Sequence, residues 1–573
     1  KAKAEKIVDD FFIDPLDSDT LGLVNIIKSN INSPVSQFVY TAAMKEPFEA
    51  GNSDKLDKWK KDKKKGLVKH LKELSKLIES IPLVSRVMAN TPTYMIFDDH
   101  EITDDWNISK RWQNQVYSKP MGRDIIRNGL MAYTIFQDWG NSPDDYVAIP
   151  PDLIPEPNKT AKTKLIRKIS EYGRRVADGS NLGTIRNQVI NPIEDHFALG
   201  KTESEIEALP EAQRNEIVDW NYKVDCGPTQ AIVLDTRTRR HFPSLNRPPG
   251  LLNDKAINDQ VPSTVPFGNA PFTFVVSPAP YFGIPSFEEL IQPAAASIVG
   301  ITTDSSTNPG ILAGQLKFDF EAWGMNKKSF EGLLKKLSDL NKVIVLSGDV
   351  HYGYSSVLDF WDGSESNPSA RMIQLTASAL KNEEFGILHL YRSAMIQKLI
   401  TGVGNNLEHL VWKDKVLSVS GPVSMKNRIR LRNNPAVLPV AGWESGSTVN
   451  LSPDYCYRLK IVHDNRTDRK SESIKIENDI NLSDAAGTKE AYKKIVQRSQ
   501  ENFISGVHRR MVWPSNVGLV KFEKDESDKL SVKHEFLFKK GDRDIEAKDI
   551  DTHIVHKIKL DAEGDELTKP ALP

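Results

Sequence analysis

The feature that most constrains this chain is an apolar segment that runs directly into a cluster of charged residues. Residues 93–97 (TYMIF) are typical of a β-strand, and Asp98, Asp99, His100 and Glu101 follow at once. Burying an unpaired charge costs several kcal/mol, so a buried strand with this ending implies a bound cation or a proton. A solvated acidic turn is the alternative that this stretch alone leaves open.

The same arrangement recurs along the chain. Apolar strands are predicted at residues 230–237, 272–276, 342–346 and 370–376, and a helix is predicted within residues 315–340. Helices that alternate with apolar strands indicate an α/β core whose strands are buried on both faces. Four of the predicted strands end in polar residues, and open α/β sheets bind ligands at the carboxyl ends of their strands.

Length predicts more than one domain, because 573 residues exceed the size of an ordinary single core. We expect a helical segment at residues 1–90 and a core at 91–385 that contains a largely helical insertion near 141–222. An α+β extension is expected at 386–573. The elements predicted within it are strands at 457–462, 517–522 and 530–538 and a helix at 489–507.

Composition excludes several classes of protein. The 77 acidic and 76 basic residues nearly cancel, so no overall field attracts nucleic acid or a membrane, and the lysine-rich residues 55–65 are interpreted as a solvated face. No apolar run is long enough to span a membrane. Two cysteines, Cys226 and Cys456, exclude a disulfide framework, and both are expected to be buried thiols. With no export segment, they favour the cytoplasm, and export stays open because the chain begins at Lys1.

A second cluster follows the strand at 342–346. Asp349 and His351 alternate along a segment expected to be extended, which would point both to one side, and Gly348 permits a close backbone turn. Carboxylates together with imidazoles suit Mn, Fe, Zn or, with more oxygens, Ca. In a two-metal hydrolytic site, such ligands come from several strand ends, and a histidine that is not bound to metal can protonate the leaving oxygen.

Residues 91–107 (TPTYMIFDDHEITDDWN) and 346–353 (LSGDVHYG) resemble the alkaline phosphatase D (PhoD-like) family of calcineurin-like metallophosphoesterases. The resemblance spans roughly residues 85–140 and 230–385. It implies a sandwich of two central sheets flanked by helices, and hydrolysis of phosphate mono- or diesters by a hydroxide activated by two or more metal ions. Three further segments fit the same order, namely 233–237 (VLDTR), 319–323 (DFEAW) and 374–382 (QLTASALKN).

The resemblance also implies roles for individual residues. Asp99 stands where the superfamily has a metal-binding Asn or Asp, and His100 stands at its catalytic histidine. Asp349 and His351 occupy the positions of the terminal metal-binding pair. Further candidates are Asp98 and Asn107 as metal ligands and Arg237 and Lys381 as phosphate-binding cations, with a structural salt bridge as the alternative for each cation.

One part of the family pattern is missing upstream of Asp99. The pattern begins with a strand bearing Asp and a second ligand, followed by a Gly-Asp-x-x-Tyr segment, whereas residues 1–90 resemble the helical stretch that normally comes next. We therefore expect a site that an upstream segment or a second chain completes. The alternative is a non-catalytic binding or assembly subunit that keeps the fold without a complete metal site.

The remaining histidines are expected to be structural or solvated. His553 and His556 are close in sequence but are expected on a charged tail, and His241 is the first exception to consider because it follows Arg237 closely. The same expectation holds for His196, His389, His409, His463, His508 and His534.

Overall fold

The computed structural model divides into two compact units, Lys1–Tyr94 and Met95–Pro573. In the first unit residues 78–90 are helical, and the other elements that the structure describes belong to the second. The structure describes residues 78–103, 106–146, 160–243, 245, 248–263, 270–284, 321–378, 407–413, 419–420, 436–439, 448–449, 451–465, 510–512, 515–539 and 550–571. The predictions for residues 55–65, for residues 489–507 and for Lys381 lie outside these ranges.

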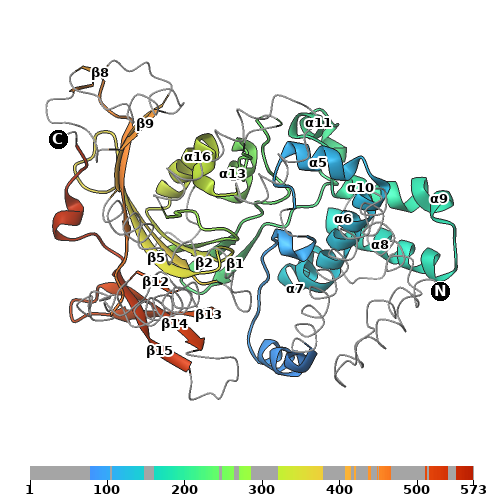
Figure 1. Cartoon of the computed structure of the whole chain (residues 1–573), viewed down its shortest axis with the longest axis horizontal. Helices are drawn as coiled ribbons and strands as arrows, with labels where there is room; N and C mark the ends of the chain where they lie inside the picture. Colours follow the sequence, from blue (N-terminus) through green and yellow to red (C-terminus); the bar gives the residue numbers. More distant parts are fainter. Residues whose placement is uncertain are drawn as a thin grey trace, which may run out of the picture. The chain divides into compact units, whose positions relative to one another are not determined.

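A ten-stranded mixed sheet forms the centre of the second unit (Figure 1). Strands from both sides of residue 385 belong to it. In spatial order it contains β1 (Tyr222–Cys226), β2 (Thr229–Val233), β3 (Thr273–Ser277), β4 (Lys342–Ser347), β6 (Ala370–Thr376), β5 (Gly353–Asp362), β11 (Tyr455–Ile461), β7 (Leu407–Trp412) and β9 (Ala436–Pro439), with β12 (Met511–Val512) beside β5.

The four strands predicted between residues 230 and 376 are confirmed as β2, β3, β4 and β6. They are adjacent and parallel, whereas the other pairings in this sheet are antiparallel. Because parallel strands end at the same edge, the segments that follow them lie side by side. These segments are residues 234–240, 278–284, 348–352 and 377–378.

Side-chain alternation along β4 connects three layers. Val343 and Val345 belong to a core shared with helices α13 (Asp254–Gln260) and α16 (Lys327–Ser338). Ile344 belongs to a second core on the opposite face, as the two-residue period of a strand requires. That face is covered by an antiparallel sheet of β13 (Asn516–Lys524), β14 (Leu530–Lys539) and β15 (Ile550–Lys559), as Figure 1 shows. The fold is therefore mixed α/β, with helices on one face and a small sheet on the other.

A separate helical core lies beside the large sheet. Ser109 and Thr160 cap its helices α5 (Lys110–Tyr117) and α8 (Ala161–Ala177) by accepting hydrogen bonds from the first turn. The other helices here are α6 (Pro120–Tyr133), the π-helix η3 (Thr134–Asp138), α7 (Trp139–Asn141), α9 (Leu182–Ile185), the π-helix η7 (Arg186–Ile190), α10 (Asn191–His196), α11 (Glu203–Glu207) and α12 (Glu211–Arg214). Short elements elsewhere are the 3-10 turns η4 (Pro143–Asp145), η9 (Trp323–Met325) and η11 (Gly564–Leu567) and the strand pair β8 (Val419–Ser420) and β10 (Thr448–Val449).

The strand predicted at residues 93–97 is wrong. The segment pairs with no sheet, and residues 92–98 have no regular secondary structure. Phe97 alone of this segment is fully buried, and it packs into the helical core: its ring lies 4.6 Å from that of Tyr133 and 5.4 Å from that of Trp106. Aromatic packing of this kind suits a residue that is also typical of strands.

Two further expectations are also wrong. Cys226 is exposed because it ends β1 at a tight turn, although Cys456 is buried as expected. His556 does not lie on a charged tail but is fully buried in β15, where apolar residues alternate with lysines. A strand with one covered face produces this alternation, because its lysines lie on the exposed face.

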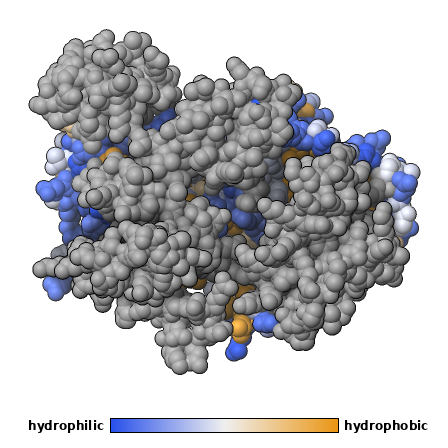
Figure 2. All heavy atoms as spheres, viewed as in Figure 1, coloured by the Kyte–Doolittle hydropathy of each residue, from blue (hydrophilic) through white to orange (hydrophobic). Residues whose placement is uncertain are grey.

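The described helices include none that is long and apolar enough to cross a membrane. In the view of Figure 2 the described surface is mostly hydrophilic, with hydrophobic residues only in small patches.

A buried histidine pair lies where the small sheet meets the large one. Ser355 Oγ of β5 is 3.0 Å from His534 Nδ1 and 2.8 Å from His556 Nδ1. A hydroxyl donates one hydrogen bond and accepts others, so it can join two neutral imidazoles that use opposite tautomers. Burial, and then the neighbouring His556, hold the pKa of His534 well below its usual value. Asp464, also buried, lies 3.9 Å from His556 Nε2.

We predict that His534 makes the fold acid-sensitive. Below a pH of about 6.5, His534 binds a proton in the unfolded protein but stays neutral in the folded one. The free energy of unfolding therefore falls by up to about 1.4 kcal/mol for each pH unit of acidification. Burial raises the pKa of Asp359 to about 6, which makes the folded protein more stable as the pH falls. Because this effect opposes that of His534, the test compares variants at each pH. In urea titrations from pH 7.5 to 5, His534→Gln should show a smaller acid loss than the wild type. If the free energy of unfolding depended on pH in the same way in both proteins, the prediction would be wrong. His241→Gln is the control, because His241 is half-exposed.

Candidate functional site

Three carboxylates meet at the carboxyl end of β4. Asp98 and Asp99 come from the segment that opens the 3-10 turn η2 (Asp99–Glu101), and Asp349 comes from the loop after β4. One oxygen of each lies within 4.8 Å of the others, and no other such group of three occurs among the described residues. Glu101 closes the turn, because its Oε2 accepts the backbone N–H of Asp98 at 2.9 Å.

The loop that carries Asp349 has an unusual backbone. Asp349 has φ 68° and His351 has φ 58°, in the left-handed region that non-glycine residues rarely adopt. The N–H of Val350 donates to the carbonyl of Gly348 at 2.8 Å, which closes a γ-turn around Asp349. The expectation of an extended segment is therefore wrong here. Such strain persists where surrounding contacts hold it, often at functional sites.

Arg237 is buried among carboxylates. Its guanidinium lies 2.5 Å from Asp98, 3.2 Å from Asp99 and 2.5 Å from Glu321. Burial opposes its charge, yet Glu321, Asp98, Asp99 and Asp349 together raise the pKa of Arg237 above its usual value. The sequence left two roles open for Arg237, phosphate binding and a structural salt bridge. Its partners in the structure favour the salt bridge.

Asn107 belongs to the same framework. Its Nδ2–H donates to the carbonyl of Arg237 at 3.2 Å, and its Oδ1 accepts from Gln113 at 3.4 Å. Arg240 donates to the carbonyl of Asn107 at 3.0 Å and to both oxygens of Glu321 at 3.1 and 3.0 Å. Asn107, also left-handed with φ 65°, therefore connects the loop that carries it to the loop that carries Arg237.

Carboxylates gather around the guanidinium of Arg237. Asp98, Asp99, Glu321 and Asp349 all act on its charge, and Arg240 also pairs with Glu321. Burial would raise the pKa of Glu321, but Arg237 and Arg240 outweigh it and lower that pKa. Burial raises the pKa of Asp99 to about 6, although Arg237 opposes this. The cluster therefore concentrates carboxylate oxygens, which are the ligands that hard divalent cations prefer.

The donor set fits one hard cation. Three carboxylate oxygens within 4.8 Å of each other can bind one ion, and an oxygen-rich set suits Mn or Ca more than Zn. The expectation of two or more ions stays a prediction, because the described residues bring together one group only. His100 is exposed and His351 is half-buried, and neither is part of that group.

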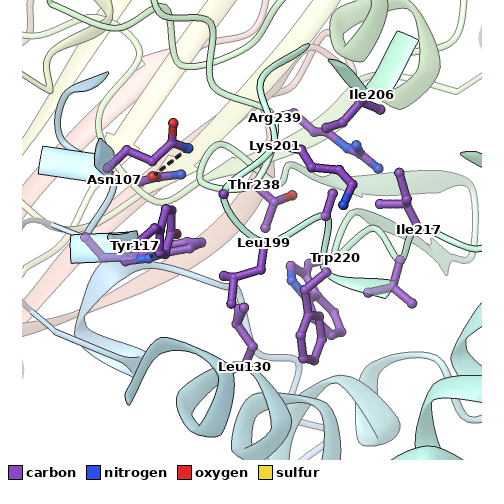
Figure 3. Close-up of a pocket in the computed structure, with 16 residues that line it drawn as sticks. Asn107, Tyr117, Leu130, Leu199, Lys201, Ile206, Ile217, Trp220, Thr238 and Arg239 are labelled. Carbon is purple, nitrogen blue, oxygen red and sulfur yellow. Dashed lines mark hydrogen bonds between the residues drawn. The ribbon is translucent and has the colours of Figure 1, made fainter. Parts of the chain in front are cut away.

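Two pockets lie away from the carboxylates. Figure 3 shows Asn107 and Tyr117 beside a pocket that Trp220 also lines, with a volume of about 40 Å³, enough for a few waters and too small for an organic group. His241 lines the other, of about 290 Å³, where its Nδ1 is 3.0 Å from Glu203. His241 therefore contacts Glu203 at the surface, away from the three carboxylates.

Sequence reasoning missed Glu321 and Arg240. Glu321 lies within the motif at residues 319–323, where its position among ordered segments was a signal, but no role followed from it. Arg240 stands three residues after Arg237, and only the folded structure shows that both bind one carboxylate.

We predict that Arg237→Gln will destabilise the protein by about 3–5 kcal/mol, because it leaves buried carboxylates without their cation. Arg239→Gln is the matched control two residues away. Arg239 pairs with the half-exposed Asp219, and the loss of a surface pair costs about 1 kcal/mol or less. Urea unfolding at pH 7.5 measures both. Equal losses in the two variants would show that Arg237 has no special role.

Comparisons with protein-family models, with curated proteins and with solved structures find no match to this chain. What the site does is therefore inferred from its own side chains, from their geometry and from the motif resemblance.

Proposed function

We propose that the chain is a metal-dependent hydrolase of phosphate esters, in which Asp98, Asp99 and Asp349 hold a divalent cation. The observation that carries the proposal is the meeting of these three carboxylates at the carboxyl end of β4. The ordered motifs that resemble PhoD-like enzymes support it, and the mixed α/β fold is compatible with it. A calcineurin-like arrangement of two central sheets is part of the same proposal.

The proposal assigns a separate role to each residue of the site. Asp98, Asp99 and Asp349 bind the cation, and Arg237 holds the first two in place through its ion pairs. When bound, a divalent cation would supply positive charge to the phosphoryl oxygens and lower the pKa of a coordinated water. His351, in the same loop as Asp349, is the proposed further ligand.

His100 is the proposed proton donor. It lies in η2 directly after Asp99, and its side chain is exposed, so a substrate can reach it. An imidazole changes protonation near neutral pH and can give a proton to a departing alkoxide. Arg237 has no such access, because its guanidinium is buried by carboxylates.

The alternative is a subunit that binds a cation or a phosphate group without hydrolysis. It is favoured by one observation: the described residues supply one group of three ligands, whereas a two-metal mechanism needs more. The two functions differ in one measurable property, since only the hydrolase cleaves phosphate esters.

We predict that Asp349→Asn will weaken Mn²⁺ binding at least tenfold and abolish ester hydrolysis. Asparagine tolerates the left-handed backbone of this position, so the change removes charge with little strain. Calorimetry with Mn²⁺ and nitrophenolate release from nitrophenyl mono- and diesters measure the two effects, with Asp254→Asn, in a surface pair with Lys328, as control. A wild type that binds Mn²⁺ without cleaving either ester would favour the alternative, and a wild type that does neither would refute the proposal.

His100→Gln should slow the hydrolysis of alkyl phosphates about 10²- to 10⁴-fold, because an alkoxide needs a proton to leave. The hydrolysis of nitrophenyl esters should slow much less, since nitrophenolate leaves without needing a proton. Affinity for Mn²⁺ should not change. His241→Gln controls for loss of a partly exposed imidazole. Equal losses on both substrates would exclude His100 as the proton donor.

A further inference from the structure

The small sheet of β13, β14 and β15 contacts the loops at the carboxyl ends of β4 and β6. A Cβ atom on Gly353, just after the first loop, would overlap the ring of Phe536 of β14. One on Gly518 of β13 would lie 2.7 Å from the Cβ of Ala377 in the second loop. No other residue allows so close an approach without a shift, so the small sheet packs directly on both loops.

One side chain of the small sheet is hydrogen-bonded to this region. Asn516, the first residue of β13, is buried, and its Nδ2–H donates to the carbonyl of Ser378 at 2.9 Å. Ser378 Oγ accepts the backbone N–H of His351 at 3.2 Å. Ser378 therefore links Asn516 to the loop that carries Asp349 and His351.

The path of the chain determines where Asn516 lies. Just before it, β12 pairs with the start of β5, with Met511 opposite Tyr354 and Val512 opposite Gly353. The chain then crosses from the large sheet into the small one, and Asn516 stands at this crossing. It is thus held close to the point where β5 leaves the His351 loop.

The loop requires support of this kind. Asp349 and His351 both have left-handed backbones, and the γ-turn around Asp349 is a strained conformation. Strain of this sort persists only where neighbouring contacts enforce it. Two hydrogen bonds from outside the loop do so: the N–H of Gly348 donates to the carbonyl of Pro278 at 2.9 Å, and that of His351 donates to Ser378.

We infer that Asn516 is a positioning residue for the candidate site: through Ser378 it holds the backbone of His351 and with it the side chain of Asp349. The small sheet then contributes to the geometry of the site. That Asp349 and His351 bind a cation rests on the proposed function, whereas the positioning of their loop by Asn516 does not. Partners one step removed from a metal ligand typically change affinity about 10- to 100-fold.

The test compares Asn516→Ala and Asn516→Asp with Asn465→Ala. Aspartate keeps the size of the side chain but lacks the N–H donor. Asn465 also binds the small sheet, accepting the N–H of Val555 at 2.9 Å, without a recorded bond to the loop. Hydrogen exchange of the His351 amide in metal-free protein should rise about tenfold in both Asn516 variants and stay unchanged in Asn465→Ala. Affinity for Mn²⁺, measured by calorimetry, should fall about tenfold in the same two.

Unchanged exchange at His351 in both Asn516 variants would overturn the inference, as would an equal rise in Asn465→Ala. If an Asn516 variant does not fold, Ser378→Ala replaces it, because it removes the acceptor of the same amide and should raise the same exchange. A wild type that binds no Mn²⁺ would refute the proposed function, while the exchange of the His351 amide would still decide the role of Asn516.

Discussion

The ion pairs of buried Arg237 are the interaction on which the site depends. One guanidinium touches Asp98, Asp99 and Glu321, which come from segments far apart in the chain. Without a cation these carboxylates would repel each other in a largely buried region, and their burial would be costly. Arg237 therefore holds them together. With Asp349 beside them, their oxygens form a group that is suited to bind a further cation.

The rest of the fold brings strained loops to this cluster and keeps them there. Parallel strands β2, β3, β4 and β6 end at one edge, so Arg237 and Asp349 become neighbours although 112 positions separate them. The small sheet packs on the opposite side of the same loops through Gly353 and Gly518. Its buried Ser355–His534–His556 contacts fasten it to the large sheet. Rigid elements on both sides thus make the left-handed backbone of Asp349 tolerable.

Sequence was sufficient for the strands that build this edge, because runs of β-branched residues such as those in β4 are typical of buried parallel strands. It also brought Asp98, Asp99 and Asp349 together as candidates, through ordered motifs. Residues 93–97 were mistaken for a strand since an apolar, aromatic run also suits packing against helices. Asn516 lies 138 positions from Ser378, and no local periodicity encodes a contact at that distance. Glu321 and Arg240 likewise acquire their roles only from tertiary contacts.

The central claim is that Asp98, Asp99 and Asp349 hold a cation. Anomalous diffraction from crystals grown with Mn²⁺ measures this directly, because it locates the metal without reference to activity. The account predicts one strong anomalous peak within coordinating distance, about 2.0–2.6 Å, of an oxygen from each of the three carboxylates. A well-ordered map with Arg237 in place and no peak between these carboxylates would contradict it.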